Sequence, residues 1–89
     1  MKVAVFGMWH LGTVTAACVA AVGIRTTGID DDAGRVVGLA RGEPPLFEPG
    51  LAELLRAGLD AKTFSVTTDL AAAADADVVW ICHDNAGRR

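Results

Sequence analysis

Two patterns of apolar residues alternate along this chain. Short runs of apolar and β-branched residues, which are typical of strands, lie at 3–6, 25–30, 64–68 and 77–82. Segments with helical spacing or strong helix formers lie at 11–22, 33–40, 51–59 and 69–74. The chain therefore predicts strands that alternate with helices.

The order of these segments indicates an α/β fold. Strands that alternate with helices form parallel pairs joined by right-handed crossovers. The four expected strands fit half of a doubly wound parallel sheet, so we expect a Rossmann-like domain with spatial strand order 3-2-1-4. The segment 41–50 holds three prolines and two glycines and is expected to be a loop.

The first helical segment has six residues at helical spacing, and we expect Cys18 to lie on a packing face: Leu11, Val14, Thr15, Cys18, Val19 and Val22. The alanines at 16, 17, 20 and 21 favour a helix and permit close packing. Gly23 follows and favours a helix end there. Cys18 and Cys82 do not have the spacing of metal ligands, and no metal site is expected. Both are interpreted as reduced, buried thiols of a cytoplasmic protein.

Composition narrows the class of protein. The chain has 89 residues, of which 52% are hydrophobic, and this suits one small domain at 1–84 followed by a tail at 85–89. A net charge of −3 argues against a nucleic-acid partner, which would need a clustered basic patch. Met1-Lys2 leads straight into a strand, so we expect no signal peptide, and no apolar run approaches the ~20 residues that span a bilayer.

Gly7 and Gly12 stand after the first strand and before the first helix, at the outer positions of the G-x-G-x-x-G spacing. Such a loop presents backbone N–H groups and a helix N-terminus to a diphosphate. Trp9 occupies the position of the middle glycine, which normally lets the backbone approach the pyrophosphate. By itself the spacing is equally compatible with a phosphate-binding loop and with a tight turn in which Trp9 covers the core edge.

Asp30 favours the phosphate-binding interpretation. It lies at the end of the second strand, 23 residues after Gly7, where dinucleotide-binding folds carry an acidic residue for the adenosine ribose. A carboxylate there repels a 2′-phosphate, which favours NAD over NADP. Arg35 lies about one helical turn further on and either contacts the adenosine or is a solvated helix residue.

Two stretches are more specific than the glycine loop. The first runs from Met1 to Cys18, and the second is Gly42-Glu43-Pro44-Pro45-Leu46-Phe47-Glu48-Pro49-Gly50-Leu51. With them, the chain resembles the N-terminal NAD-binding domain of the UDP-glucose/GDP-mannose dehydrogenases from Met1 to about Asp84. The second stretch is the more diagnostic because generic Rossmann domains lack it.

The resemblance implies an NAD-dependent oxidoreductase that oxidises the C6 hydroxymethyl group of a nucleotide sugar to a carboxylate. His10 and Leu11 would offer backbone N–H groups to the pyrophosphate, Asp30 would hold the ribose, and Arg35 would assist at the adenosine. The loop from Glu48 to Leu51 would lie towards the substrate.

The chain departs from the family at two places. Family members usually carry glycine where Trp9 stands, and a Thr-Pro pair where this chain has Asn85-Ala86. Asn85 keeps hydrogen-bonding capacity and remains a candidate cofactor contact. The catalytic cysteine and lysine of the family lie in later segments, so no catalytic residue is assigned here, and we interpret residues 85–89 as a truncated tail.

Three hypotheses follow for the function. The leading one is the NAD-binding portion of a nucleotide-sugar 6-dehydrogenase, inactive as an isolated 89-residue chain. The second is a non-catalytic remnant that binds nucleotide weakly and needs a partner chain. The third, the nucleotide domain of a hydroxyacid or hydroxyacyl dehydrogenase, is disfavoured by the Glu48-Pro49-Gly50 loop. An exposed sheet edge would favour association of copies into a homo-oligomer.

Overall fold

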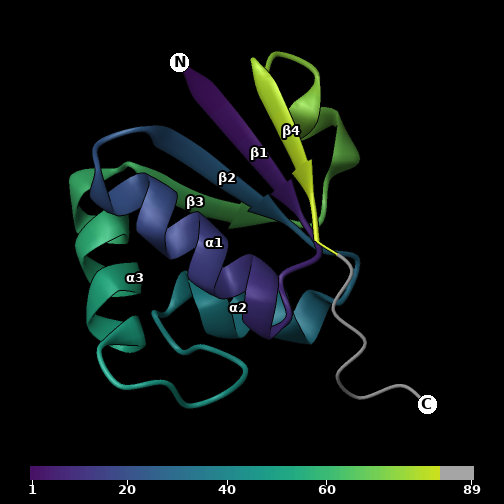
Figure 1. Cartoon of the computed structure of the whole chain (residues 1–89). Helices are drawn as coiled ribbons and strands as arrows, with labels where there is room; N and C mark the ends of the chain where they lie inside the picture. Colours follow the sequence, from purple (N-terminus) through teal and green to yellow (C-terminus); the bar gives the residue numbers. More distant parts are fainter. Residues whose placement is uncertain (83–89) are drawn as a thin grey trace.

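The computed structural model describes residues 1–82 and contains a four-stranded parallel sheet (Figure 1). Its strands lie side by side in the order β3-β2-β1-β4. They are β1 (Lys2–Phe6), β2 (Arg25–Ile29), β3 (Phe64–Thr67) and β4 (Val78–Ile81). The α/β class and the expected strand order are therefore confirmed.

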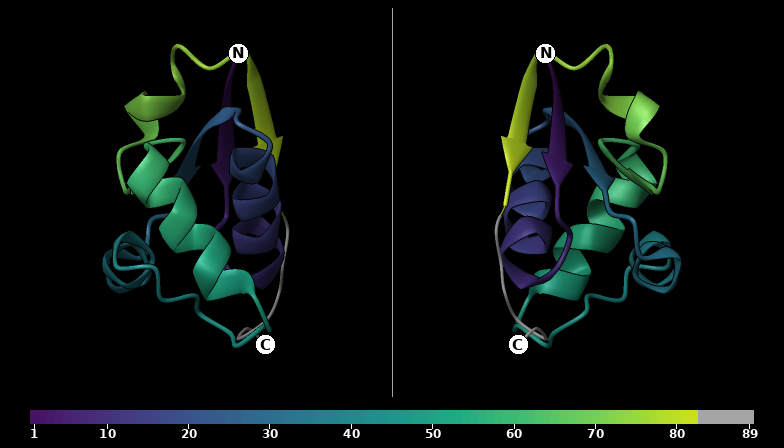
Figure 2. Two further views of the ribbon diagram at one scale, coloured as in Figure 1. Left: turned by 90° about the vertical axis from the view of Figure 1, so that its left-hand side faces the viewer. Right: turned by 90° about the vertical axis from the view of Figure 1, so that its right-hand side faces the viewer.

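Helices join the strands as the apolar patterns predicted. They are α1 (His10–Ala21), α2 (Ala33–Ala40), α3 (Leu51–Ala61) and the short 3₁₀-helix η1 (Leu70–Ala73). The helices α1 and α3 pack side by side on one face of the sheet, and η1 lies against the opposite face (Figures 1 and 2). Within residues 1–82, no helix combines the length and the apolar character that crossing a bilayer requires.

The helix α1 packs on the sheet with a different face from the one expected. Its buried residues are small: Gly12, Thr13, Ala16, Ala17 and Ala20. Leu11 and Val22 are 51% and 73% exposed, and Cys18 is exposed as well. The expected packing of Leu11 and Val22 and the expected burial of Cys18 were therefore wrong, whereas Val14 does pack against the core.

The reason is the closeness of α1 to β1. A Cβ atom on Gly12 would overlap the carbonyl oxygen of Gly7, so the first turn lies directly against the end of the strand. At this distance only small side chains fit directly between helix and sheet. Val14 and Val19 pack beside them and stay partly buried. Alanine spacing, rather than the spacing of the larger apolar residues, marked the buried face.

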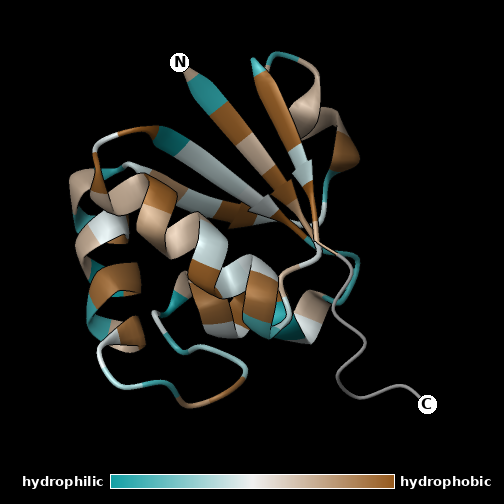
Figure 3. Cartoon of the chain, in the orientation of Figure 1, coloured by the Kyte–Doolittle hydropathy of each residue, from teal (hydrophilic) through white to brown (hydrophobic). Residues whose placement is uncertain are grey.

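The core lies between the sheet and the helices α1 and α3. Val5, Met8 and Leu55 are fully buried there, and Phe64 is 3% exposed. The strand β4 differs, because all four of its residues, Val78 to Ile81, are exposed although each is apolar. Figure 3 shows β4 largely in the hydrophobic colour at the edge of the described sheet.

Candidate functional site

The carboxyl ends of β1 and β2 hold the two residues that the sequence singled out most strongly. Gly7 follows β1 and donates its N–H to the carbonyl of Ile29, the last residue of β2, at 2.9 Å. Asp30 directly follows β2, the neighbouring strand. Gly7 has φ +87°, and a Cβ atom there would lie 2.6 Å from the carbonyl oxygen of Cys82. Both the turn and the close approach of Cys82, the residue after β4, therefore require glycine at this position.

The carboxylate of Asp30 is buried, with its side chain only 4% exposed. The Met8 N–H donates to Oδ2 at 2.7 Å, and the Asp32 N–H donates to Oδ1 at 2.9 Å. Burial by itself raises the pKa of Asp30, but these two N–H groups and the Arg35 guanidinium outweigh it and hold the pKa below its ordinary value. Asp30 is thus an ionised group that ties β2 to the glycine loop.

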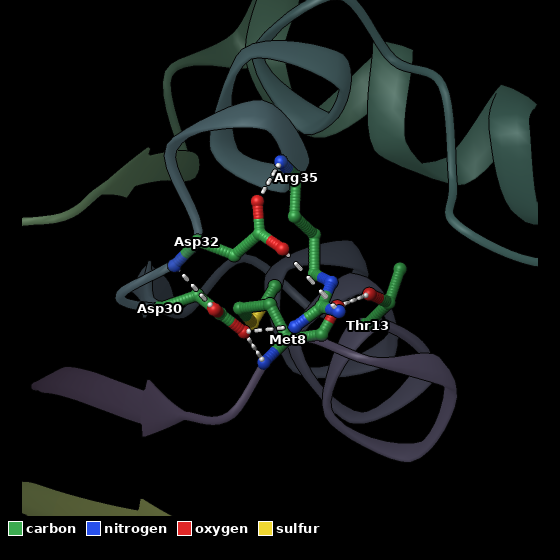
Figure 4. Close-up of polar contacts among 5 residues, drawn as sticks. All are labelled: Met8, Thr13, Asp30, Asp32 and Arg35. Carbon is green, nitrogen blue, oxygen red and sulfur yellow. Dashed lines mark hydrogen bonds and ion pairs between the residues drawn. The ribbon is translucent and has the colours of Figure 1, made fainter. Parts of the chain in front are cut away.

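Arg35 reaches back from α2 to this carboxylate (Figure 4). Its Nη1 donates to Oδ2 of Asp30 at 3.0 Å, and its Nη2 lies 3.7 Å from Oδ2 of Asp32. Its Cζ lies 4.9 Å from the centre of the Trp9 ring, which is the distance of a cation–π contact. Asp32 also caps α2 by accepting the Arg35 N–H at 3.0 Å. The guanidinium is therefore held by two carboxylates and one aromatic face.

Met8 and Thr13 support the loop from inside, and the sequence did not single them out. Met8 is fully buried, and a Cβ atom on Gly28 of β2 would lie 2.5 Å from its Cε. The Thr13 hydroxyl donates to the Met8 carbonyl at 2.7 Å. Nothing in the apolar pattern distinguished Met8 from a surface loop residue. Asp32, by contrast, directly precedes a helical segment, which is a recognisable cap signal.

The N-terminus of α1 carries the features of an anion site. Trp9 is the N-cap residue and makes no side-chain capping hydrogen bond, and the first turn holds no acidic residue. Nε1 of Trp9 and Nδ1 of His10 are buried without a hydrogen-bond partner in the described structure. Nε2 of His10 lies 3.4 Å from Oε1 of Glu48, so the loop 41–50 reaches this helix end. The unpaired polar atoms and the positive helix end favour a negative ligand.

A cavity of about 480 Å³ opens at the same edge of the sheet. Its size lies within the range of small-ligand pockets. It is lined by residues from the ends of β1 and β2, from α2 and from the start of η1: Phe6, Gly7, Ile29, Asp30, Asp31, Arg35, Thr68 and Leu70. Apolar walls beside a carboxylate fit the two halves of an adenosine, its base and its ribose. The residues present therefore fit a dinucleotide whose phosphates lie at α1.

The structure thus gathers most of the predicted site residues at one edge of the sheet. Gly7, Asp30 and Arg35 line the cavity, and His10 and Gly12 lie in the first turn of α1. Leu11 lies in the same turn, with its side chain half-exposed. Asn85 lies outside the described residues. The Glu48 loop, expected towards the substrate, contacts His10.

Comparison with known proteins gives the same picture. The family model for the NAD binding domain of the UDP-glucose/GDP-mannose dehydrogenase family matches residues 1–85. The UDP-glucose 6-dehydrogenase of Pseudomonas aeruginosa is 45% identical over 82 residues, which are 91% of this chain and 18% of that protein. The GDP-mannose 6-dehydrogenase of the same organism is 36% identical over 83 residues, covering 92% of this chain and 19% of that protein.

Solved structures agree in fold. The GDP-mannose dehydrogenase of P. aeruginosa matches 100% of this chain and 21% of its own, with a TM-score of 0.91 and 33% identity. A UDP-glucose dehydrogenase from the archaeon Pyrobaculum islandicum matches 91% of this chain and 19% of its own, with a TM-score of 0.85 and 32% identity.

This chain spans about a fifth of the length of these relatives. The matched part is the cofactor domain, so the expectation of NAD as the cofactor is confirmed at the level of the family. The glycine loop, the buried Asp30 and the adjoining cavity all lie within the matched residues. The chain belongs to the UDP-glucose/GDP-mannose dehydrogenase family, whose NAD binding domain it contains.

Proposed function

We propose that this chain is the NAD-binding portion of a nucleotide-sugar 6-dehydrogenase that acts on UDP-glucose or a similar nucleotide sugar. The observation that carries the proposal is the buried, ionised Asp30 at the mouth of a cavity next to the N-terminus of α1. The relatives named UDP-glucose 6-dehydrogenase and GDP-mannose 6-dehydrogenase support the substrate class.

Each residue would serve one part of the cofactor. Asp30 accepts hydrogen bonds from the ribose hydroxyls, since it is ionised and lines the cavity. Arg35 and Leu70, which also line the cavity, flank the adenine. The backbone at His10 and Leu11 faces the diphosphate with the positive end of the α1 dipole. Gly7 and Gly12 allow the close packing that places this helix end at the strand.

The chemistry that NAD supplies when bound is acceptance of a hydride from the C6 carbon of the sugar. The chain's own residues bind and orient the cofactor. Cys18 is exposed on α1 and Cys82 is buried beyond β4, and we assign neither a catalytic role. Turnover then depends on groups outside this chain, in keeping with the fivefold greater length of the relatives. Asn85 is proposed as a further contact near the cofactor.

Titration of NAD into the purified chain tests the binding proposal. Trp80 is replaced by phenylalanine so that Trp9, which contacts Arg35, is the fluorescent reporter. We expect a saturable change in emission that calorimetry reproduces. Asp30→Ala is expected to abolish it, and Asp60→Ala, an exposed change on α3, is expected to leave it intact.

Two results would contradict the proposal. A folded chain that shows no saturation up to millimolar NAD would support the alternative of a non-catalytic remnant. Formation of NADH by this chain alone with UDP-glucose or GDP-mannose would contradict the claim that turnover needs further segments. Folding is checked in each case by circular dichroism.

A further inference from the structure

We propose that Asp32 and Trp9 are specificity-determining positioning residues that keep Arg35 from binding a 2′-phosphate and so make the site selective for NAD over NADP. This inference rests on the proposed function. It concerns two residues that do not line the cavity, whereas Asp30 and Arg35 do.

The starting point is that the site already contains an arginine. In dinucleotide-binding folds that accept NADP, an arginine near the end of the second strand accommodates the 2′-phosphate. Arg35 stands in that region, lines the cavity and is 26% exposed. Selection against NADP therefore needs a reason why this guanidinium does not turn to a phosphate.

The contacts of Arg35 supply the reason. Nη1 donates to the buried carboxylate of Asp30, and Nη2 pairs with the carboxylate of Asp32. The Trp9 ring lies against the guanidinium at 4.9 Å. Both terminal nitrogens and one face are thus directed at groups of the protein. A 2′-phosphate would have to displace at least one of these contacts.

The local charge adds to this constraint. Asp30, Asp31 and Asp32 bring three carboxylates to the site against the single guanidinium of Arg35. A ribose hydroxyl donates to a carboxylate, but a dianionic phosphate is repelled by it. Asp32 thus acts twice, as a negative charge and as the partner that holds Nη2 of Arg35.

Asp32→Asn tests the ion pair between Asp32 and Arg35 separately from the helix cap. Asparagine caps a helix as well as aspartate does, so the hydrogen bond to the Arg35 N–H is retained. We expect the ratio of the Kd for NADP to the Kd for NAD, measured by calorimetry, to fall about two- to fivefold, the scale of a partly exposed ion pair. Trp9→Leu is expected to lower the same ratio with no change of charge. Trp9 makes no side-chain cap, so that variant removes no capping hydrogen bond.

Repeating both substitutions in a chain that also carries Arg35→Met provides the decisive comparison. If Asp32 and Trp9 act through Arg35, Trp9→Leu leaves the ratio unchanged in Arg35→Met. Asp32→Asn then shifts the ratio less in Arg35→Met than in the wild-type background, and the remainder is the direct repulsion of the phosphate by the Asp32 charge. A shift of equal size with and without Arg35, or an unchanged ratio in both single variants, overturns the inference while NAD binding stands. A wild-type chain that binds neither nucleotide overturns the proposed function and the inference together.

Discussion

At the scale of single residues, Asp30 joins folding to ligand binding. The same carboxylate accepts the Met8 N–H inside the loop and lines the cavity that faces a ligand. Its position was predictable from the end of an apolar strand and the spacing to Gly7. Its partner Met8 was not, because a buried loop methionine leaves no periodic signal.

Asp30→Asn should destabilise the fold in a pH-dependent way. The amide would present a donor or a weaker acceptor to the Met8 N–H, at a cost of about 1–3 kcal/mol near neutral pH. Because the folded pKa of Asp30 lies below 3.8, its contribution is complete above that pH and is lost as the pH falls through the folded pKa.

Urea denaturation near neutral pH and in acid measures the difference. The free energies of unfolding of wild type and Asp30→Asn should converge in acid, whereas Asp31→Asn, an exposed neighbour, should differ little from wild type throughout. A gap that stays constant or widens in acid would contradict this account.

Gly12→Ala tests the contact between α1 and β1. The new Cβ atom would overlap the Gly7 carbonyl oxygen, so the helix must shift, and we expect a loss of about 3 kcal/mol or more. Gly38→Ala on α2 is the matched control. Its Cβ atom would lie no closer than 3.5 Å to Glu43, and it should stabilise by about 0.5–1 kcal/mol through helix propensity. Equal effects of the two substitutions in chemical denaturation would refute the overlap.

At the scale of elements, α1 shows where reading the sequence succeeds and where it fails. Its start, its end near Gly23 and its place between β1 and β2 followed from apolar spacing and glycine. Its alanines indicated close packing, but the exposure of Leu11 and Cys18 did not follow from the sequence, since larger side chains usually point to the core. The required approach of Gly12 to Gly7 reversed this preference, and only tertiary structure reveals such a distance. The pairing of Arg35 with Trp9 is likewise invisible in the sequence, because it joins two separate elements.

Lys62 ends α3 in the left-handed region, with φ 63°, and is the non-glycine residue with positive φ within residues 1–82. This conformation costs a residue with a Cβ atom about 1–2 kcal/mol. Glycine avoids this cost but loses more chain entropy on folding, so only part of the free energy is recovered. Lys62→Gly should therefore raise the free energy of unfolding by about 0.5–1 kcal/mol. Lys62→Ala, which removes the charge but keeps the strain, should give no such gain in the same urea titration.

At the scale of the whole molecule, the sheet is covered unevenly. The helices α1 and α3 lie on one face (Figure 2), while all four residues of β4 are exposed. Exposed apolar strands at a sheet edge are surfaces for pairing with further chain or with another copy. The expected homo-oligomer therefore stays a prediction, and the exposed edge strand β4 is its basis.

The 89-residue polypeptide should therefore self-associate in a concentration-dependent manner. Val79→Lys places a charge in the middle of β4 and should lower the average mass seen by sedimentation velocity at equal concentration. Lys substitution at Ala57, an exposed position on α3, serves as the control. A monomeric wild type would contradict the prediction.

Binding of NAD should stabilise the entire domain. A ligand at 100 times its Kd adds about 2.7 kcal/mol to the folded state. In a domain of this size that corresponds to a rise of roughly 10–20 °C in Tm. Differential scanning calorimetry with NAD, and with inorganic pyrophosphate as a control for ionic effects, measures it. An equal rise in Tm with NAD and with pyrophosphate would show that binding of the anion alone accounts for the stabilisation.

The two roles of Asp30, in folding and in ligand binding, have an evolutionary consequence. Selection for folding alone would preserve Gly7, Gly12 and Asp30, because each is needed to close the loop on the sheet whether or not a cofactor is used. Asp31, which lines the cavity from an exposed position, would be free to drift once binding lost its value. Among descendants of this domain, retention of Asp31 is therefore the record of continued cofactor use, and retention of Gly7, Gly12 and Asp30 is the record of a surviving fold.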